Sequence, residues 1–138
     1  PPVLEAFLGW ANGAKGGALS AAEGEVVQLL AAEKMQCDYC LAAHSKIALG
    51  TGLSEDDCLQ IRTRRSDDPK MQALINFAAE ALDSYGNVSD ETLAKFMEAG
   101  FSTEAAIEVV AGISVITFTS FYNHVHKTVV DFPEVAAV

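Results

Sequence analysis

The segment MQCDYCLAAHSKIALG, Met35 to Gly50, places two cysteines and a histidine at positions i, i+3 and i+7. The whole chain has only three cysteines and three histidines, so this grouping stands out. On a helix, Cys37, Cys40 and His44 project within about 60° of one another. They would share one face, as a redox centre, as part of a metal site, or as ordinary residues of a buried helical face.

Thiol chemistry is the first interpretation of this spacing. Cys37 stands at the expected start of a helix, where unpaired N–H groups and the positive end of the helix dipole stabilise a thiolate. Cys40 is the i–4 neighbour of His44, whose imidazole can take the thiol proton and return it to a departing oxygen. The spacing alone does not decide which cysteine attacks.

The two cysteines are also close enough in sequence to form a disulfide across a short loop. A peroxide would oxidise one thiolate to a sulfenic acid, and the other cysteine would condense with it. This cycle requires no bound cofactor and no metal.

Two other interpretations stay open on the residues alone. A zinc site would use the same thiolates and imidazole, but a tetrahedral site needs a fourth ligand, for which Cys58 or a carboxylate would have to serve. Alternatively, the cysteines are small buried apolar residues and His44 is satisfied locally.

The elements around the motif are all predicted to be helices. Serines precede several amphipathic runs, SAAE at 20–23 fits a capping box, Asp68 with Pro69 marks another start, and glycines follow expected ends. The β-branched run VVAGISVITF is opened by the helical segment STEAAIE, so it is assigned to a helix. The expected helices are 3–14, 20–35, 38–50, 54–63, 69–85, 89–98 and 103–125. The fold class is therefore all-α, a compact multi-helix fold.

Composition indicates the number of domains and the classes of partner that the protein is expected to bind. The 138 residues are enough for a single domain, 1–138, and the 19 acidic against 9 basic residues oppose binding to nucleic acid or anionic membranes. Half the residues are apolar, which predicts burial between subunits of an oligomer. The longest apolar stretch, Val109 to Tyr122, falls short of a membrane span. With no secretory signal and an odd cysteine count, a cytoplasmic protein is expected.

The chain resembles the alkylhydroperoxidase D-like branch of the carboxymuconolactone decarboxylase superfamily. The resemblance covers nearly the whole chain, in LSAAEGEVVQLLAAEKMQCDYCLAAH, ALGTGLSEDD, NVSDETLAKFMEAGFSTEAAIEVV and FYNHVHKTVVDFP. Its signature is a glutamate twelve residues before the first motif cysteine, followed by C-x-x-C-x-x-x-H. These positions are Glu25, Cys37, Cys40 and His44.

This resemblance implies an all-helical trimer or hexamer with thiol-dependent peroxidase or disulfide reductase activity in antioxidant defence. By position, Cys40 matches the cysteine that peroxide attacks, Cys37 the resolving cysteine, and Glu25 with His44 the proton relay. Turnover would need an external dithiol, which would exchange at a more accessible Cys37.

Several residues near the motif have competing interpretations. Glu25 lies beside an apolar stripe and could be partly buried, whereas Glu33 would lie nearer the cysteines in a simple helical hairpin. Tyr39 stands where some family members have a histidine, so it would donate a hydrogen bond or cover the site. His124 and His126, at the end of the long helix, would either approach a neighbouring subunit's site or complement the helix dipole. Cys58 is expected to pack, and RTRR at 62–65 is expected to be a solvated basic patch.

Three alternative functions accompany this interpretation. A lactone decarboxylase would need basic residues near the site and gives the paired cysteines no role. A non-enzymatic redox sensor would use the same disulfide to change oligomer packing. A zinc-binding module would hold metal on purification.

Overall fold

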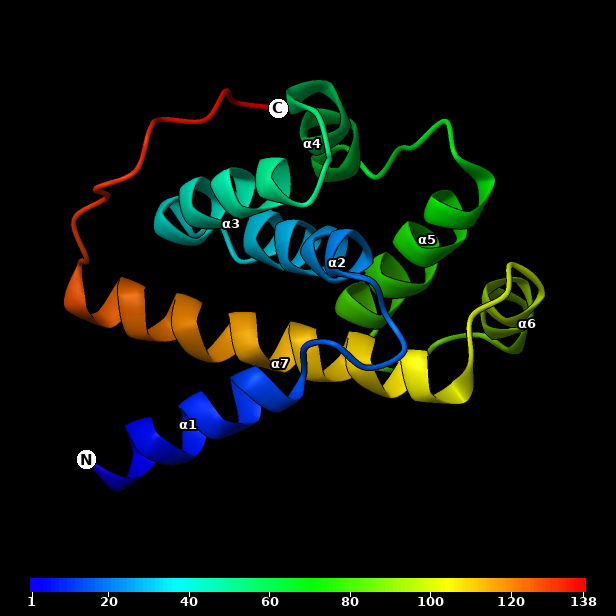
Figure 1. Ribbon diagram of the computed structural model, residues 1–138, viewed down its shortest axis with the longest axis horizontal. Coiled ribbons are helices and arrows are strands. Elements are labelled where there is room, and N and C mark those ends of the chain that lie inside the picture. Colours follow the sequence, from blue (N-terminus) through cyan, green and yellow to red (C-terminus); the bar gives the residue numbers. More distant parts are fainter.

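The computed structural model describes residues 1–138 and contains seven α-helices and no strand (Figure 1). The helices are α1 (Pro2–Gly13), α2 (Ala21–Lys34), α3 (Asp38–Gly50), α4 (Glu55–Arg62), α5 (Pro69–Asp83), α6 (Asp90–Glu98) and α7 (Thr103–His126). The all-helical prediction is confirmed, and every helix lies where the sequence placed it, with small shifts at the ends.

Side-chain caps explain where the helices begin. The Ser20 hydroxyl accepts the Glu23 N–H, and the Glu23 carboxylate accepts the Ser20 N–H, which together form the expected capping box. The Asp68 carboxylate accepts two N–H groups of the first turn of α5, with Pro69 at its first position. Local polar groups therefore define these starts before any tertiary packing.

Helix α2 is the centre of the molecule. It contacts α3, α4, α5 and α7, and most of its residues are buried (Figure 1). Val26 and Leu29 have no exposed surface, and the same cluster includes Leu74 of α5 and Val109 of α7. Because Glu25 belongs to this central helix, its carboxylate is held by well-packed neighbours.

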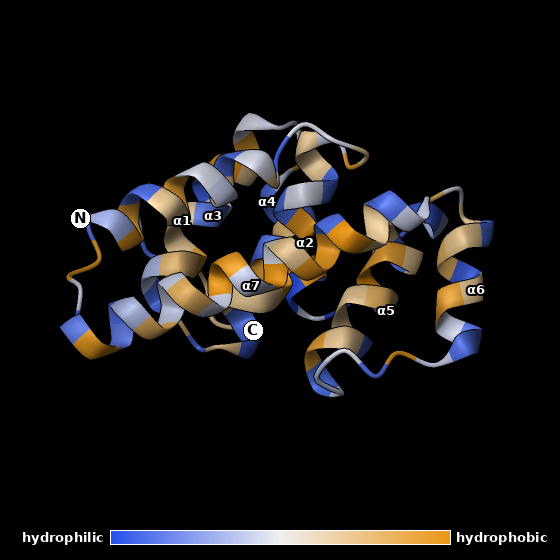
Figure 2. Cartoon of the chain, turned by 90° about the horizontal axis from the view of Figure 1, so that it is seen from below, coloured by the Kyte–Doolittle hydropathy of each residue, from blue (hydrophilic) through white to orange (hydrophobic).

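Helix α7 lies along one side of α2, α3 and α5 and is hydrophobic over much of its length (Figure 2). By length and composition alone it could cross a membrane. This differs from the expectation for Val109 to Tyr122, because the helix continues from Thr103 to His126. One such helix is weak support for a membrane span, since helices in the core of soluble proteins meet the same criteria.

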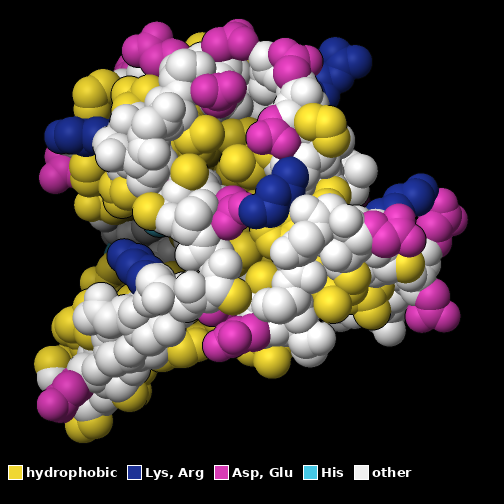
Figure 3. Space-filling view, turned by 45° about the vertical axis from the view of Figure 1, so that its right-hand side comes forward, with side chains coloured by type: hydrophobic (Ala, Val, Ile, Leu, Met, Phe, Trp, Pro, Cys, Tyr) yellow, Lys and Arg dark blue, Asp and Glu magenta, His cyan; other side chains and the backbone are white.

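Helix α1 extends away from the other helices and buries none of its residues (Figure 1). Phe7 stacks on Phe118 of α7 with ring centroids 4.6 Å apart, whereas Trp10 is 45% exposed. Phe7 therefore attaches this helix to α7. Apolar side chains gather on the projecting arm at the lower left of Figure 3.

The C-terminal segment, residues 127–138, returns from the end of α7 across α3 toward α4 (Figure 1). Phe132 packs edge-on against Tyr39 with centroids 5.4 Å apart, and Arg62 donates to the Ala136 carbonyl at 2.6 Å. These contacts hold the segment over the helix that carries the motif histidine.

Candidate active site

The short connection between α2 and α3 presents the two motif cysteines side by side. Gln36 has a left-handed backbone (φ 52°), which turns the chain directly before Cys37. Cys37 is the N-cap of α3, and its Sγ accepts the Cys40 N–H at 3.3 Å. The two sulfurs are 2.7 Å apart, and no disulfide joins them. The sequence predicted that Cys37 begins a helix and that the two thiols lie close together, and the structure agrees on both points.

Both thiols are buried in the chain. Cys37 is 1% exposed and Cys40 is 3% exposed. The expectation that Cys37 is the more accessible cysteine was therefore wrong, because its position as N-cap turns its side chain inward against the first turn of α3. Access to either sulfur requires movement of the covering residues.

Helix α7 supplies polar groups to the sulfurs that the sequence interpretation did not include. The Cys40 sulfur lies 3.5 Å from Ser120 Oγ, 3.8 Å from Thr119 Oγ1 and 3.5 Å from Asn123 Nδ2. The Asn123 amide also donates to Cys37 Sγ at 3.8 Å. A signal was present in the sequence, because Ser120 and Asn123 are polar residues one turn apart in a mostly apolar helix.

Burial and neighbouring groups act on the Cys40 thiol in opposite directions. Burial raises its pKa above the ordinary range, and the adjacent Cys37 raises it further. The Ser120 and Thr119 hydroxyls lower it, because hydrogen bonds stabilise the thiolate. The net direction of the pKa is upward, so the resting Cys40 favours the protonated thiol.

Glu25 and His44 form a hydrogen-bonded pair between α2 and α3. His44 Nδ1 lies 2.7 Å from Glu25 Oε2, and Glu25 is 8% exposed. When Glu25 is a carboxylate, Nδ1 donates its proton to it and Nε2 of the neutral ring is left as an acceptor. His44 makes no hydrogen bond with Cys40, although they are i and i+4. The ring is instead turned toward α2 by Glu25.

Glu33, the rival carboxylate, is occupied elsewhere. Its Oε2 accepts from Arg62 Nε at 2.6 Å, and the Arg62 side chain is 5% exposed. Arg64 forms a bidentate pair with Asp83. The RTRR segment is therefore not a wholly solvated basic patch, because Arg62 turns inward to join α2, α4 and the C-terminal segment.

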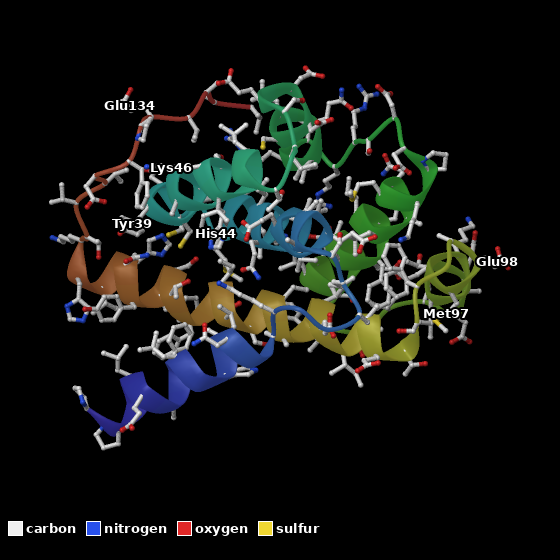
Figure 4. The ribbon with its side chains drawn as sticks, in the orientation of Figure 1. Tyr39, His44, Lys46, Met97, Glu98 and Glu134 are labelled. Carbon is white, nitrogen blue, oxygen red and sulfur yellow. The ribbon has the colours of Figure 1, made fainter.

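Tyr39 and His124, which the sequence also indicated, make no hydrogen bond to the sulfur of Cys37 or Cys40. Tyr39 lies under the C-terminal segment, as does Lys46, whose ammonium sits 5.8 Å from the Phe132 ring centroid (Figure 4). His124 Nε2 is 3.2 Å from the Gln36 carbonyl oxygen and so contacts the loop before Cys37.

Cys58 is separate from the redox pair. It is 5% exposed and belongs to the main core, and burial raises the pKa of its thiol. It lines a pocket of about 370 Å³ between α3, α4 and the C-terminal segment, which includes neither Cys37 nor Cys40. The zinc alternative needs four ligands in one place, and the structure brings together no group of three or more Cys, His, Asp or Glu side chains suited to a metal.

Comparisons with solved structures show the same fold. Protein ATU0492 from Agrobacterium tumefaciens, a protein of unknown function named as a candidate antioxidant defence protein AhpD, matches with a TM-score of 0.84 at 17% identity. That match covers 95% of this chain and 92% of the other. A variant of the debrominase Bmp8 in complex with 2,3,4-tribromopyrrole matches with a TM-score of 0.77 at 20% identity, covering 91% of this chain and 69% of that one.

A comparison with curated proteins finds no match. The family is assigned by the sequence of residues 1–84, which matches the carboxymuconolactone decarboxylase family. This range includes Glu25, Cys37, Cys40 and His44. Because this match covers more than half of the chain, the protein belongs to the carboxymuconolactone decarboxylase family, and its fold is that of the AhpD-like protein ATU0492.

Proposed function

We propose that this protein is a thiol-dependent peroxidase or disulfide oxidoreductase that cycles through a Cys37–Cys40 disulfide in antioxidant defence. The observation that supports it most is that the Cys37 and Cys40 sulfurs lie 2.7 Å apart without a disulfide between them. A second observation is the hydrogen-bonded Glu25–His44 pair on the adjoining helices. Neighbouring thiols with a nearby proton relay suit a two-electron reduction that uses no bound cofactor.

In the proposed cycle, the Cys40 thiolate attacks one oxygen of a hydroperoxide. The O–O bond breaks, the sulfur becomes a sulfenic acid, and the alcohol leaves with a proton supplied through His44. Cys37 then attacks the Cys40 sulfur and expels water, which forms the disulfide. An external dithiol supplies the two electrons that restore both thiols.

Burial favours a small hydroperoxide over a protein disulfide as the oxidising substrate. Cys37 and Cys40 expose only 1% and 3% of their surfaces. A protein disulfide must reach sulfur with a bulky chain on each side, whereas a small peroxide needs only a brief local opening. The proposed enzyme is therefore an alkyl hydroperoxide reductase of peroxiredoxin-like activity.

The polar groups around the sulfurs argue against lactone decarboxylation. That reaction would require cations to hold substrate carboxylates, but the side chains that contact Cys40 from α7 are the neutral Thr119, Ser120 and Asn123. Arg62 is paired with Glu33. The thiol reaction is thus the better match to this site.

We also propose that the chain works as a homo-oligomer, a trimer or hexamer, in the reducing cytoplasm. Large apolar side chains are exposed on α1 and on α7, including Phe121 at 61% and Val125 at 77%. Burial of such surface between copies would remove it from water.

The test is to add one equivalent of cumene hydroperoxide to reduced protein and follow intact mass and alkylation. Loss of two thiols, mapped to a Cys37–Cys40 bridge, is expected, while Cys58 stays alkylatable after unfolding. Cys40→Ser should stall bridge formation and Cys58→Ser should leave it unchanged. Persistent peroxide with both thiols intact would refute the peroxidase.

Steady turnover separates an enzyme from a redox sensor. With dithiothreitol as the reductant, an enzyme consumes many equivalents of hydroperoxide far faster than dithiothreitol alone does, whereas a sensor accelerates this consumption little. Because Bmp8 is a debrominase, 2,3,4-tribromopyrrole is a useful comparison substrate. Faster thiol oxidation by this compound than by the hydroperoxide would reassign the substrate class.

A further inference from the structure

The side-chain hydroxyl groups of α7 differ in their hydrogen-bond partners. Ser114 Oγ and Thr117 Oγ1 each donate to a backbone carbonyl one turn earlier, at 2.8 Å, as serines and threonines commonly do in helices. Ser120 has no exposed surface, and its only hydrogen-bond partner is the Cys40 sulfur at 3.5 Å. A buried hydroxyl is costly without a partner, so the orientation of Ser120 is tied to that sulfur.

Asn123 is the second α7 group directed at the pair, one turn after Ser120. Its amide is 3.5 Å from Cys40 Sγ and 3.8 Å from Cys37 Sγ. An amide N–H is a donor only, so at both sulfurs it favours the thiolate over the thiol. Ser120 reaches one sulfur and Asn123 reaches both.

We propose that Ser120 and Asn123 form a donor cradle, contributed by α7, that stabilises negative charge on the reacting sulfurs and makes both residues catalytic. The inference rests on the proposed function for its chemistry. The cradle lies outside the Cys-x-x-Cys motif and outside residues 1–84, the part of the chain that matches the family.

Each donor has a place in the proposed cycle. While Cys40 is a thiolate, Ser120 and Asn123 both donate to the attacking sulfur. After the O–O bond has broken and Cys40 is a sulfenic acid, the negative charge required for the next step is on Cys37. Of the two cradle residues, Asn123 alone contacts that sulfur, so the same amide can support both the attacking and the resolving thiolate.

The donor cradle and burial act in opposite directions on the pKa of the Cys40 thiol. Burial and Cys37 raise the pKa of the Cys40 thiol, and Ser120 is among the groups that lower it. Without the α7 donors, less Cys40 would be thiolate at neutral pH. The reaction with peroxide would slow in proportion, because the thiolate is the nucleophile.

The test measures each thiol separately and uses no peroxide. In Cys37→Ser/Cys58→Ser protein only Cys40 can be alkylated, and in Cys40→Ser/Cys58→Ser protein only Cys37 can. Iodoacetamide alkylation is followed by intact mass from about pH 6 to pH 10, values chosen to bracket the usual thiol pKa of about 8.5. The midpoint of each profile reports the thiol pKa.

The expected pattern differs between the two variants. Ser120→Ala should lower the thiolate fraction of Cys40 at about pH 7 by about threefold to tenfold and leave that of Cys37 unchanged. Asn123→Leu should lower both fractions. Asn123→Asp, which is nearly isosteric but adds negative charge, should lower both further than Asn123→Leu.

Ser114→Ala is the matched control, because it deletes a hydroxyl of the same helix that faces a carbonyl rather than sulfur. Midpoints of Ser120→Ala and Asn123→Leu that equal those of Ser114→Ala, in proteins with parental circular dichroism, would overturn the cradle. A peroxide-inert parent with the expected midpoint shifts would instead reject the proposed function and keep the cradle.

Discussion

At the scale of single residues, the Glu25–His44 pair is the proposed proton relay. Because Glu25 is 8% exposed and 2.7 Å from His44 Nδ1, its charge fixes the ring tautomer that leaves Nε2 free to accept. Glu25→Gln keeps the shape and removes the charge. The rate of cumene hydroperoxide consumption should fall by about a hundredfold, as expected when general acid–base catalysis is lost.

Glu33→Gln is the informative comparison for that rate. Glu33 pairs with Arg62 and has no contact with the relay, so this variant should melt at a lower temperature but react normally while folded. An equal loss of rate in both variants would show that the Glu25 result reflects general destabilisation.

Cys58 gives a prediction about pH and stability. Burial raises the pKa of its thiol in the folded protein above the unfolded value of about 8.5, so the folded state favours the protonated form. This contribution is fully present below about pH 8.5 and is lost as pH rises through the folded pKa. The parent should therefore lose stability relative to Cys58→Ala in alkali.

The measurement is urea unfolding with reductant at several pH values. The difference in unfolding free energy between parent and Cys58→Ala should be constant from about pH 6 to pH 8 and shrink above about pH 9. A difference that stays constant through about pH 10 would contradict the assigned direction of the pKa shift.

The candidate site was only partly predictable at this scale. The periodicity of a helix places Cys37, Cys40 and His44 on one face, but it does not say that His44 forms its hydrogen bond with Glu25 rather than with Cys40. Sequence spacing also cannot bring Asn123 to sulfurs 83 and 86 residues away. Those contacts depend on how α7 packs against α3, which local patterns do not encode.

At the scale of elements, the link between α1 and α2 is fixed by one side chain of α7. Glu108 accepts the Ala18 and Leu19 N–H groups at 2.7 and 2.8 Å. Gly17 passes so close that a Cβ there would collide with the Glu108 carboxylate. A Cβ at position 17 would therefore force the Glu108 carboxylate to shift away from the loop.

Gly17→Ala should destabilise the protein by about 1–3 kcal/mol, because Glu108 must move and release its backbone donors. Thermal or urea unfolding measures the change. Gly13→Ala is the control, since a Cβ at Gly13 meets nothing within 4 Å. If both variants unfold alike, the contact between the loop and Glu108 does not limit stability.

Helix boundaries were the most predictable feature at this scale. The Ser20, Ser54 and Asp68 caps are local, so each is visible in a few residues of sequence and holds in the structure. The course of residues 127–138 was not predictable, because it depends on distant partners such as Tyr39 and Arg62.

At the scale of the whole molecule, the apolar surface of α1 and α7 predicts self-association. The chain mass is 14.6 kDa, and light scattering should give a multiple of it, as expected for a trimer or hexamer. Val125→Glu, at a side chain that is 77% exposed, should shift the population toward the monomer because it places charge in an apolar contact.

Leu93→Glu provides the comparison for this surface. Leu93 is 41% exposed on α6, a helix that packs on α5 rather than on α7, so the assembled mass should stay unchanged. A monomeric parent, or loss of assembly in Leu93→Glu but not in Val125→Glu, would show that the α1–α7 surface is not the interface.

The division of the site along the chain has a consequence for how reactivity can change. Ser120 lies 80 residues after Cys40, so the thiols and the donors proposed to stabilise their charge occupy separate stretches of sequence. Substitutions in one helix can then adjust nucleophilicity while the redox motif is untouched. Substitutions at positions 120 and 123 offer a way to raise or lower the reaction rate of the thiols by design. For the same reason, two proteins with identical Cys-x-x-Cys segments are expected to differ in their rates of reaction with peroxide.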